Sequence, residues 1–499
     1  MESEKGKEVR SNVMQLKALA AQAVCRELRK RGSSKEMEKK NTAKRVHCVV
    51  LSYPAQGHIN PIHQFSKHLK QEGVRVTLVT TRFYCKKLQK VPVSIALETI
   101  SDGFDEGGEA DAGGFREYMD RFWQVGAQTL AELVEKHNKT SDPVDCIIYD
   151  SFLPWVLDVA KRFGILGVPF LTQNMYVNSI YYHVHLKKLH VPLTENEIFL
   201  PVLPKLQLED MPSFFFFSRY ADNPALLDLL VGQFSNIDQA DWILYNSFYE
   251  MEKEVIDWTM KIWPKLRTIG PSIPSMILDK RVKDNEDYGV TQFKSEEYCM
   301  TWLDDKPKQS VVYVSFGTMV ALNEEQMKEI SYGLRDSGSY FLWVVRASEE
   351  YKLPKDFQKK SEKGIVIAWC SQLKVLAHKA IGCFVTHWGW NSTLEALSFG
   401  VPVVAVPQWS DQNTNAKQIV EVWKMGVRAT KDETQIVRQE VLKNCIREIM
   451  EREKGKEVKS NVMQLKSLAA QAVNEGGSSH KNTKEFVNCL LSQQATKSQ

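Results

Sequence analysis

The sequence predicts an α/β protein built from two doubly wound domains, each a parallel β-sheet covered by helices. The chain has 499 residues, which exceeds one domain of ordinary size. Short apolar segments rich in Val, Ile and Tyr alternate with helical segments in the first third of the chain, and the alternation begins again after residue 310. A stretch rich in proline and charge, 269–289, separates the two regions and is the expected linker.

The first alternating region begins with a predicted strand, a loop and a helix. The strand is the apolar segment 46–53, and Asn60-Pro61 then predicts a helix start, because Asn is a favoured N-cap and Pro suits the first helical position. Further strands are expected at 74–80 and 145–149, and a helix at 156–163. Strands that alternate with helices predict a parallel sheet with right-handed crossovers.

The second region repeats this pattern more completely. A helix capped by Asn323 follows its first strand, and strands are expected at 311–315, 340–345, 365–368, 382–386 and 401–406. In doubly wound sheets, ligands bind at the carboxyl ends of the strands. Two such domains facing each other therefore predict a ligand site in the cleft between them.

Composition and charge exclude several classes of protein. Hydrophobic residues make up 43% and charged residues 25% of the chain, as in soluble globular proteins. The net charge is +4, but residues 1–45 hold 13 basic and 6 acidic side chains, a surplus of +7, so the remainder carries +4 − 7 = −3. A basic surplus confined to one end of the chain does not indicate a nucleic-acid surface.

Cysteine and hydropathy patterns argue against further classes of protein. The nine cysteines are scattered without a C-x-x-C pair, which argues against a disulfide framework and against structural zinc. The pair His183/His185 has no further ligand cluster beside it, so we expect no metal. No run approaches the roughly 18 apolar residues of a membrane span. We expect a cytoplasmic protein.

An internal repeat links the two ends of the chain. Residues 4–24 match residues 453–473, and only Arg10/Lys459 and Ala18/Ser467 differ. Each copy is predicted to be an amphipathic helix with Val, Met, Leu and Ala on one stripe. Since the fold needs one docking groove for the C-terminal copy, we expect residues 1–36 to be an extra segment, disordered or artefactual, with Met37 as the ancestral start. The alternative, a real N-terminal helix that dimerises or competes for the groove, stays open.

Two side chains of the first region have the positions that acid–base chemistry requires. His58 follows the first strand, and Asp150 follows the strand 145–149. A histidine oriented by a carboxylate on its far nitrogen can take a proton from a hydroxyl. From spacing alone, the alternatives are a loop histidine that caps the helix starting at Asn60, and an aspartate that caps the next helix.

The stretch 369–412 carries a stronger signal. His387, Gly389, Asn391 and Ser392 follow a strand and lead into the helix STLEALSFG, so backbone N–H groups and the positive helix end form an anion site that suits a diphosphate. The same stretch also holds an acidic residue for ribose hydroxyls, a flat ring for a base, and an acceptor and amide pair for sugar hydroxyls: Glu395, Trp369, Asp411 and Gln412. Core packing remains the alternative for the tryptophans.

This stretch resembles the signature box of plant family-1 UDP-dependent glycosyltransferases, and its length, 412 − 369 + 1 = 44 residues, is that of the box. The resemblance extends from about Arg45 to the C-terminal helix and includes GHINP in the first loop and the VSFGT run. It implies the GT-B architecture of two Rossmann-like domains, a UDP-sugar donor held mainly by the second domain, and inversion of the anomeric centre. The terminal Gln of the box is similar to that of glucose-preferring members.

The resemblance also implies roles for single residues. His58 is similar to the general base of the family and Asp150 to its partner. For the nucleotide, Trp369 resembles the uracil platform, the Cys370 backbone lies beside the base edge, and Gln372 and Glu395 lie at the ribose. The expected diphosphate ligands are Thr318, His387, Asn391 and Ser392, and the residues expected around the transferred sugar are Trp390, Asp411 and Gln412.

One departure from the family pattern lies inside the box, where Trp388 stands in place of the usual Cys. Its indole either repacks the pocket or faces away from the donor. The subfamily resemblance is to enzymes that glucosylate small acids, phenolics or terpenoids, through YDSFLPW and TQNMYVNS. Residues expected to line the acceptor pocket are Phe152, Thr172, Met175, Tyr181 and the run 214–217, although such aromatic residues are as often core.

The domains expected on this basis are an N-terminal acceptor-binding domain at 37–269, a linker at 270–292, a UDP-sugar-binding domain at 293–473, and a C-terminal helix and tail at 474–499. We expect a monomer that binds a UDP-sugar and a small-molecule acceptor and holds no tightly bound cofactor.

The chain lacks the motifs of rival enzymes: it has no G-x-G-x-x-G after a strand, no P-loop and no G-x-S-x-G. A ligand-binding protein without activity is the non-enzymatic alternative.

Overall fold

A computed structural model describes residues 45–88, 95–216, 224–274, 278, 298–355, 357 and 362–497. These residues fall into two compact units. The first unit holds the described residues up to Pro169 and those from Phe486 onward, and the second unit holds the described residues between them. The N-terminal copy of the repeat lies outside the described residues, as does most of the expected linker.

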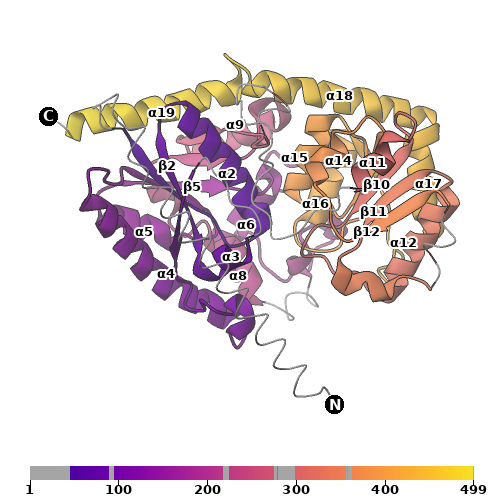
Figure 1. The fold of residues 1–499 in the computed structure, drawn as a ribbon, viewed down its shortest axis with the longest axis horizontal. Helices are drawn as coiled ribbons and strands as arrows, with labels where there is room; N and C mark the ends of the chain where they lie inside the picture. Colours follow the sequence, from indigo (N-terminus) through magenta and orange to yellow (C-terminus); the bar gives the residue numbers. More distant parts are fainter. Residues whose placement is uncertain are drawn as a thin grey trace. The chain divides into compact units, whose positions relative to one another are not determined.

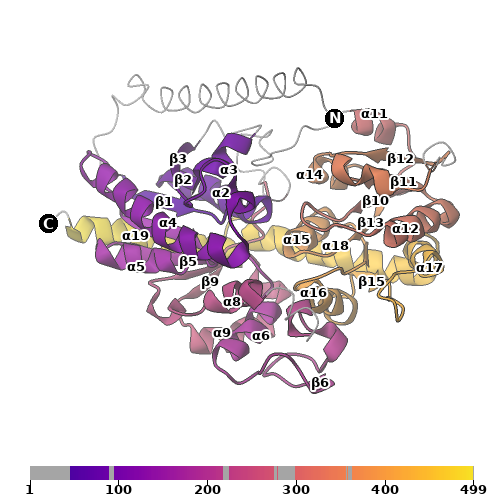
Figure 2. The same ribbon diagram turned by 90° about the horizontal axis from the view of Figure 1, so that it is seen from below.

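The first unit is a parallel sheet with helices on both faces (Figure 1). Its strands pair in the order β3-β2-β1-β4-β5. Right-handed crossovers place α2 and α3 on one face and α4 and α5 on the other, where α4 and α5 lie side by side (Figures 1 and 2). The elements are β1 (His47–Leu51), α2 (Gln56–Gln71), β2 (Arg75–Thr81), α3 (Arg82–Lys87), β3 (Ala96–Ile100), α4 (Phe115–Asn138), β4 (Cys146–Asp150), α5 (Trp155–Arg162) and β5 (Leu166–Leu171).

The second unit begins within β5, whose last two residues pair in parallel with β8, which in turn pairs with β9. Two short strands, β6 and β7, form a separate antiparallel pair. The elements of this part are α6 (Met175–His185), β6 (Glu197–Ile198), β7 (Leu206–Gln207), α8 (Pro224–Gly232), β8 (Ile243–Tyr245), α9 (Lys253–Ile262) and β9 (Leu266–Thr268).

The second unit also contains a complete six-stranded parallel sheet with the order β12-β11-β10-β13-β14-β15. In chain order this is the 3-2-1-4-5-6 arrangement of nucleotide-binding folds. The elements are α11 (Tyr298–Asp304), β10 (Val311–Ser315), α12 (Glu324–Ser337), β11 (Tyr340–Val344), β12 (Gly364–Ile367), α14 (Gln372–Leu376), β13 (Ile381–Thr386), α15 (Trp390–Phe399), β14 (Val403–Ala405), α16 (Gln412–Lys417), β15 (Gly426–Arg428), α17 (Gln439–Glu451), α18 (Glu453–Val473) and α19 (Ser478–Lys497).

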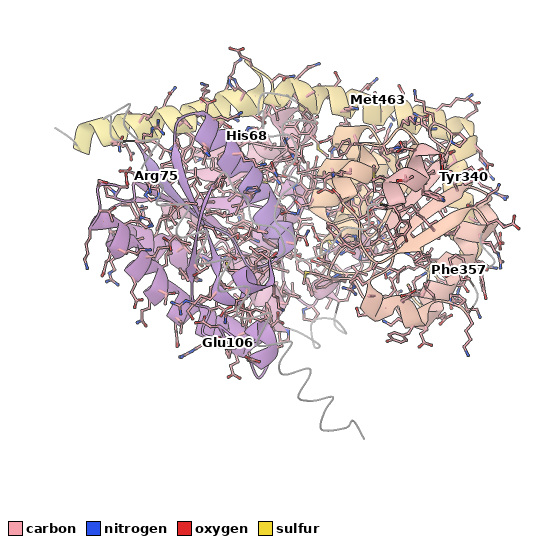
Figure 3. The ribbon with its side chains drawn as sticks, in the orientation of Figure 1. His68, Arg75, Glu106, Tyr340, Phe357 and Met463 are labelled. Carbon is pink, nitrogen blue, oxygen red and sulfur yellow. The ribbon has the colours of Figure 1, made fainter. Side chains whose placement is uncertain are left out.

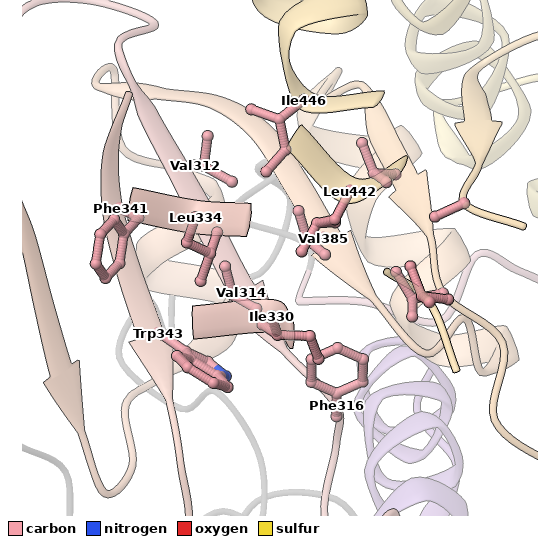
Figure 4. Close-up of a cluster of buried hydrophobic side chains, with 14 of the residues drawn as sticks. Val312, Val314, Phe316, Ile330, Leu334, Phe341, Trp343, Val385, Leu442 and Ile446 are labelled. Atoms are coloured by element: carbon pink, nitrogen blue, oxygen red, sulfur yellow. The ribbon is translucent and has the colours of Figure 1, made fainter. Parts of the chain in front are cut away.

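The core of this sheet is a continuous apolar cluster between the strands and helices α12 and α17. Val312, Val314 and Val385 from β10 and β13 meet Ile330 from α12 and Leu442 from α17 (Figure 4). All five side chains are fully buried. The alternation of strands and helices predicted for this region is confirmed, and the central strands β10 and β13 are buried along their whole length.

Helix α18 is the C-terminal copy of the repeat, and it packs against α15 and α17. Val458, Val462 and Ala469 are buried on its inner face. The predicted stripe is wrong in one member: Met463, labelled in Figure 3, is 52% exposed. It follows Val462 directly and is therefore turned about 100° away from the buried face.

The predicted helix start at Asn60-Pro61 is also wrong. Helix α2 begins at Gln56 and holds Pro61 in its interior. The carbonyl of Ala55 accepts hydrogen bonds from the N–H groups of His58 and Ile59, so the first turn closes before Asn60 is reached. By contrast, Asn323 caps α12 as predicted, with its side chain accepting a hydrogen bond from Gln326 N.

Candidate active site

Both sheets have a point where the strand order reverses, between β1 and β4 in the first and between β10 and β13 in the second. Ligands of open α/β sheets bind outside the carboxyl ends of the strands at such points. His58 and Asp150 lie at the first reversal. The VSFGT run and the loop 387–389 lie at the second.

His58 and Asp150 form a direct pair. His58 Nδ1 lies 2.7 Å from Asp150 Oδ2, the Asp150 side chain is fully buried, and the His58 side chain is 19% exposed. Because an ionised carboxylate can only accept a hydrogen bond, the Nδ1 atom carries the proton and the lone pair lies on Nε2. The pair therefore has the geometry of a histidine oriented for proton abstraction.

Their local structure differs from the sequence interpretation. His58 lies in the first turn of α2 and not in a loop, so it does not cap a helix at Asn60. Asp150 is the last residue of β4, and its Oδ1 accepts a hydrogen bond from Phe152 N at 3.1 Å. The N-cap of α5 is Pro154, so the helix-cap alternative for Asp150 is wrong.

Two aromatic rings surround His58. The Phe152 ring lies 4.8 Å from the imidazole and the Tyr53 ring 5.3 Å from it, measured between centroids. Burial raises the pKa of Tyr53 well above its usual value, so this phenol stays neutral. Phe152 was predicted at the acceptor pocket, whereas Tyr53 was missed because an aromatic residue at a strand end is ordinary in sequence.

The anion site predicted in the second unit is centred on the start of α15. Gly389 is its N-cap and Trp390 its first residue, two positions before the predicted start, so the backbone N–H groups of Asn391 and Ser392 lie in the first turn. Thr318 is exposed on the loop after β10. Gly317 has φ +71° and approaches the His387 ring so closely that a Cβ would lie 2.8 Å from Cε1.

His387 is neutral at ordinary pH. Burial lowers its pKa to about 4, against the opposing effect of a backbone hydrogen bond to Ser315. Its Nδ1 lies 3.2 Å from Thr386 Oγ1. A neutral imidazole carries a single N–H and no full charge, which leaves the helix end as the main source of positive potential here.

The two tryptophans of this loop are buried. Trp388 is 0% exposed, has φ +76°, and its indole N–H meets no hydrogen-bond partner in the described part of the chain. Trp390 is 4% exposed, and its Nε1 donates to Asn246 O at 2.9 Å. The core-packing alternative therefore describes both rings. A contact of Trp390 with a sugar requires its backbone N–H and not its indole.

A hydrogen-bonded group of side chains occupies the predicted ribose position. Gln372 Nε2 donates to Glu395 Oε2 at 2.6 Å and to Ser392 Oγ at 3.2 Å. Tyr313 OH donates to Gln372 Oε1 at 3.3 Å and lies 3.6 Å from Cys370 Sγ. Burial raises the pKa of Glu395 to about 7, opposed by the Gln372 hydrogen bond. The adjacent Trp369 is only partly buried, two residues beyond the end of β12.

Asp411 and Gln412 lie at the start of α16 and are 8% and 4% exposed. Gln412 Oε1 accepts hydrogen bonds from the backbone N–H groups of Gln408 and Trp409, at 2.8 and 3.1 Å. Since these two bonds take both lone pairs, Gln412 can offer a ligand only its amide hydrogens. Asp411 Oδ2 accepts a hydrogen bond from Asn415 Nδ2 at 2.9 Å.

The other residues predicted at the acceptor pocket lie in the second unit. Thr172, Met175 and Tyr181 are 6%, 1% and 0% exposed. Met175 N begins α6 and donates to Tyr245 OH at 2.8 Å and to Glu252 Oε1 at 3.0 Å. Burial raises the pKa of Glu252 to about 7. The Tyr181 ring packs edge-on against Phe215, and Phe217 lies outside the described residues.

The described ranges hold neither a metal-binding cluster nor a helix that could cross a membrane. Within them, no three His, Cys, Asp or Glu side chains gather as a metal site requires. His183 is buried, donates from Nδ1 to Ser179 O at 2.7 Å and stacks on Trp258. None of the described helices is both long enough and apolar enough to cross a membrane.

Comparisons with known proteins identify the family to which the chain is related. The family model of UDP-glucuronosyl and UDP-glucosyl transferases matches residues 295–473. A mogroside I-E synthase from Siraitia grosvenorii is 46% identical over 459 residues, covering 91% of this chain and 99% of that protein. A flavonol 7-O-β-glucosyltransferase from Arabidopsis thaliana is 44% identical over 451 residues, covering 89% and 98%. The crystal structure of Os79 from O. sativa in complex with UDP has a TM-score of 0.84 and 38% identity, covering 89% of this chain and 100% of that one.

Proposed function

The chain belongs to the family of UDP-glucuronosyl and UDP-glucosyl transferases, and from this premise we propose that it transfers glucose from UDP-glucose to a small hydrophobic plant metabolite. It is a UDP-glycosyltransferase of the GT-B fold. The acceptor group is a hydroxyl or carboxylate of a phenolic, terpenoid or organic acid, and the anomeric centre inverts. A flavonol is the acceptor named for one relative, which supports a small hydroxylated acceptor here.

The observation that carries the proposal is the pair of His58 and Asp150, with 2.7 Å between Nδ1 and Oδ2. His58 Nε2 takes the proton of the acceptor hydroxyl. The hydroxyl oxygen then bonds to the anomeric carbon from the face opposite the diphosphate. The bond from that carbon to the phosphate oxygen breaks, and its electron pair leaves with UDP. Asp150 stabilises the imidazolium that forms.

The donor is bound by the second unit in this proposal. Uracil stacks on Trp369 beside the Cys370 backbone, and the ribose hydroxyls bond to Gln372 and Glu395. The diphosphate binds at the N-terminus of α15, whose N–H groups stabilise the charge that grows on the leaving group. Its ligands are Thr318, His387, Asn391 and Ser392, and the sugar is bound by Asp411, Gln412 and the backbone of Trp390.

The acceptor pocket and the organisation of the chain complete the proposal. The acceptor-binding residues of the proposal are Phe152, which lies against His58, and Thr172, Met175 and Tyr181. The acceptor-binding domain is 37–269, the donor-binding domain 293–473, the linker 270–292, and the helix and tail 474–499. The enzyme acts as a cytoplasmic monomer and needs no metal.

An acceptor screen tests the proposed reaction. The protein is incubated with UDP-glucose and a panel of phenols, terpenoid alcohols and carboxylic acids, and the products are identified by mass spectrometry. We expect UDP release coupled to a mono-glucosylated product, with the β-configuration in its NMR spectrum because the donor is α-linked. Binding of UDP-glucose without product from any acceptor would instead support the non-enzymatic alternative.

A further inference from the structure

Asn415 occupies a position of unusual constraint in α16. It lies one helical turn after Asp411, and its side chain is 0% exposed. Its amide nitrogen donates to two acceptors, Asp411 Oδ2 at 2.9 Å and Trp388 O at 3.2 Å. A carboxylate and a carbonyl can only accept, so these partners determine the orientation of the amide.

The two acceptors belong to different parts of the donor site. Asp411 is the carboxylate proposed to bind the sugar, whereas Trp388 lies in the loop that leads into the diphosphate-binding helix. Trp388 also has φ +76°, a conformation that a bulky residue adopts only when its surroundings hold it there. One buried amide therefore connects the sugar-binding carboxylate to the diphosphate loop.

The amide oxygen of Asn415 lowers the stability of the folded state. Asn415 Oδ1 is buried and has no hydrogen-bond partner within the described ranges. A buried polar atom left without a partner destabilises the folded state. A side chain that carries this cost, with both of its donors directed at donor-site groups, is expected where function and not stability selects the residue.

We infer that Asn415 is a positioning residue. Its amide orients Asp411 toward the transferred sugar and fixes the position of Asp411 relative to the diphosphate loop. The inference rests on the donor site proposed above. Asn415 does not contact the sugar itself. Its removal lets the Asp411 carboxylate rotate, so recognition of the sugar weakens while the uracil and ribose contacts, which come from the segment after β12 and from α14 and α15, persist.

The test separates sugar recognition from nucleotide recognition in Asn415→Ala and Asn415→Asp. Affinities for UDP and for UDP-glucose are measured by calorimetry without acceptor, and donor selectivity is then measured as the ratio of kcat/KM for UDP-glucose to that for UDP-galactose. For Asn415→Ala we expect the affinity for UDP to fall less than the affinity for UDP-glucose, because the uracil and ribose contacts persist. Loss of a hydrogen bond to a charged group predicts that UDP-glucose binding and donor selectivity fall by about tenfold or more.

The aspartate variant adds a pH signature that a merely structural role would not produce. Two facing carboxyls share a proton, because the like charge raises one of the two pKa values. The introduced carboxyl is then protonated on the acid side and donates one hydrogen bond to Asp411. Donor selectivity should recover as the pH falls from 8 to 6 in Asn415→Asp, and it should not recover in Asn415→Ala.

Thr414→Val is the matched control. Thr414 is the preceding residue, equally buried, and its hydroxyl donates to Asp210 O at 2.7 Å and not to the donor site. This variant should keep wild-type donor selectivity. The inference is overturned if both Asn415 variants keep the wild-type ratio of UDP-glucose to UDP affinity, or if Thr414→Val lowers selectivity equally. A wild-type protein that binds neither UDP nor UDP-glucose would instead overturn the proposed function.

Discussion

Replacing Asp150 with Asn should lower kcat/KM for a phenolic acceptor by at least about a hundredfold. Asp150 Oδ2 lies 2.7 Å from His58 Nδ1, and the carboxylate is fully buried. A hydrogen bond to a charged group contributes about 1.5–3 kcal/mol. At 1.4 kcal/mol per factor of ten, the loss of this stabilisation of the imidazolium alone predicts a reduction of about 10- to 150-fold.

The orientation of the new amide increases the loss. Phe152 N donates to Asp150 Oδ1 at 3.1 Å, and an N–H group requires an oxygen there. In Asp150→Asn the amide NH2 group therefore faces His58 Nδ1, which must then accept. The proton moves to Nε2, and the base loses the lone pair that takes the acceptor proton.

Initial rates with saturating UDP-glucose, together with the affinity for UDP, measure this effect. The UDP affinity should remain at the wild-type value, because Asp150 has no place in the proposed donor site. Asp145→Asn is the control, since it also neutralises a carboxylate next to β4 but one that binds His47 N at 2.9 Å. Turnover by Asp150→Asn within threefold of wild type would refute the reasoning.

Three further predictions follow from the second unit. Trp369→Ala should weaken UDP binding by about 5- to 150-fold in calorimetry, because stacking a base on an aromatic ring contributes about 1–3 kcal/mol. Gln412→Ala should leave the UDP affinity unchanged. Equal losses of UDP affinity in the two variants would contradict the division of roles. The raised pKa of Glu395, about 7, should make uridine binding pH-dependent, because ribose hydroxyls favour the ionised carboxylate. The affinity for uridine should therefore rise from pH 6 to pH 8. An equally steep rise in Glu395→Gln would assign the pH dependence to another group. A protein starting at Met37 should keep its melting temperature and activity. A chain ending before Glu453 loses α18 and exposes the apolar groove, so its melting temperature should be lower. Aggregation of the Met37 protein would show that the first segment is needed.

Most of the fold could be predicted from the sequence because its central strands are apolar runs that are buried on both faces. The strand 311–315 has the predicted bounds, and the other predicted strands of that sheet end within two residues of them. The start of α2 could not be predicted in this way. Asn60-Pro61 has the local pattern of a helix start, but the backbone hydrogen bonds of Ala55 close the helix one turn earlier.

The candidate site also contains residues that could be selected from the sequence and residues that could not. Residues inside a motif, such as His58 and the donor box, could be selected from the sequence, and their roles stay predictions. Tyr313 and Asn415 could not be selected, because Tyr313 bonds to a residue 59 positions away and Asn415 joins Asp411 to Trp388, which lies 27 positions away. The direction of the Trp388 indole was equally undetermined, since only the packed structure shows that it is 0% exposed.

The most direct test of the account compares His58→Ala on a phenolic acceptor and on a carboxylic-acid acceptor with UDP-glucose as donor. General-base catalysis typically contributes about 10² to 10⁴ in rate, so kcat for the phenol should fall by that factor while UDP affinity is unchanged. A carboxylate is already ionised near pH 7 and needs no base, so kcat for the acid should fall much less. Wild-type turnover of the phenol by His58→Ala, or an equal loss for both acceptors, would contradict the assignment of His58 as the base.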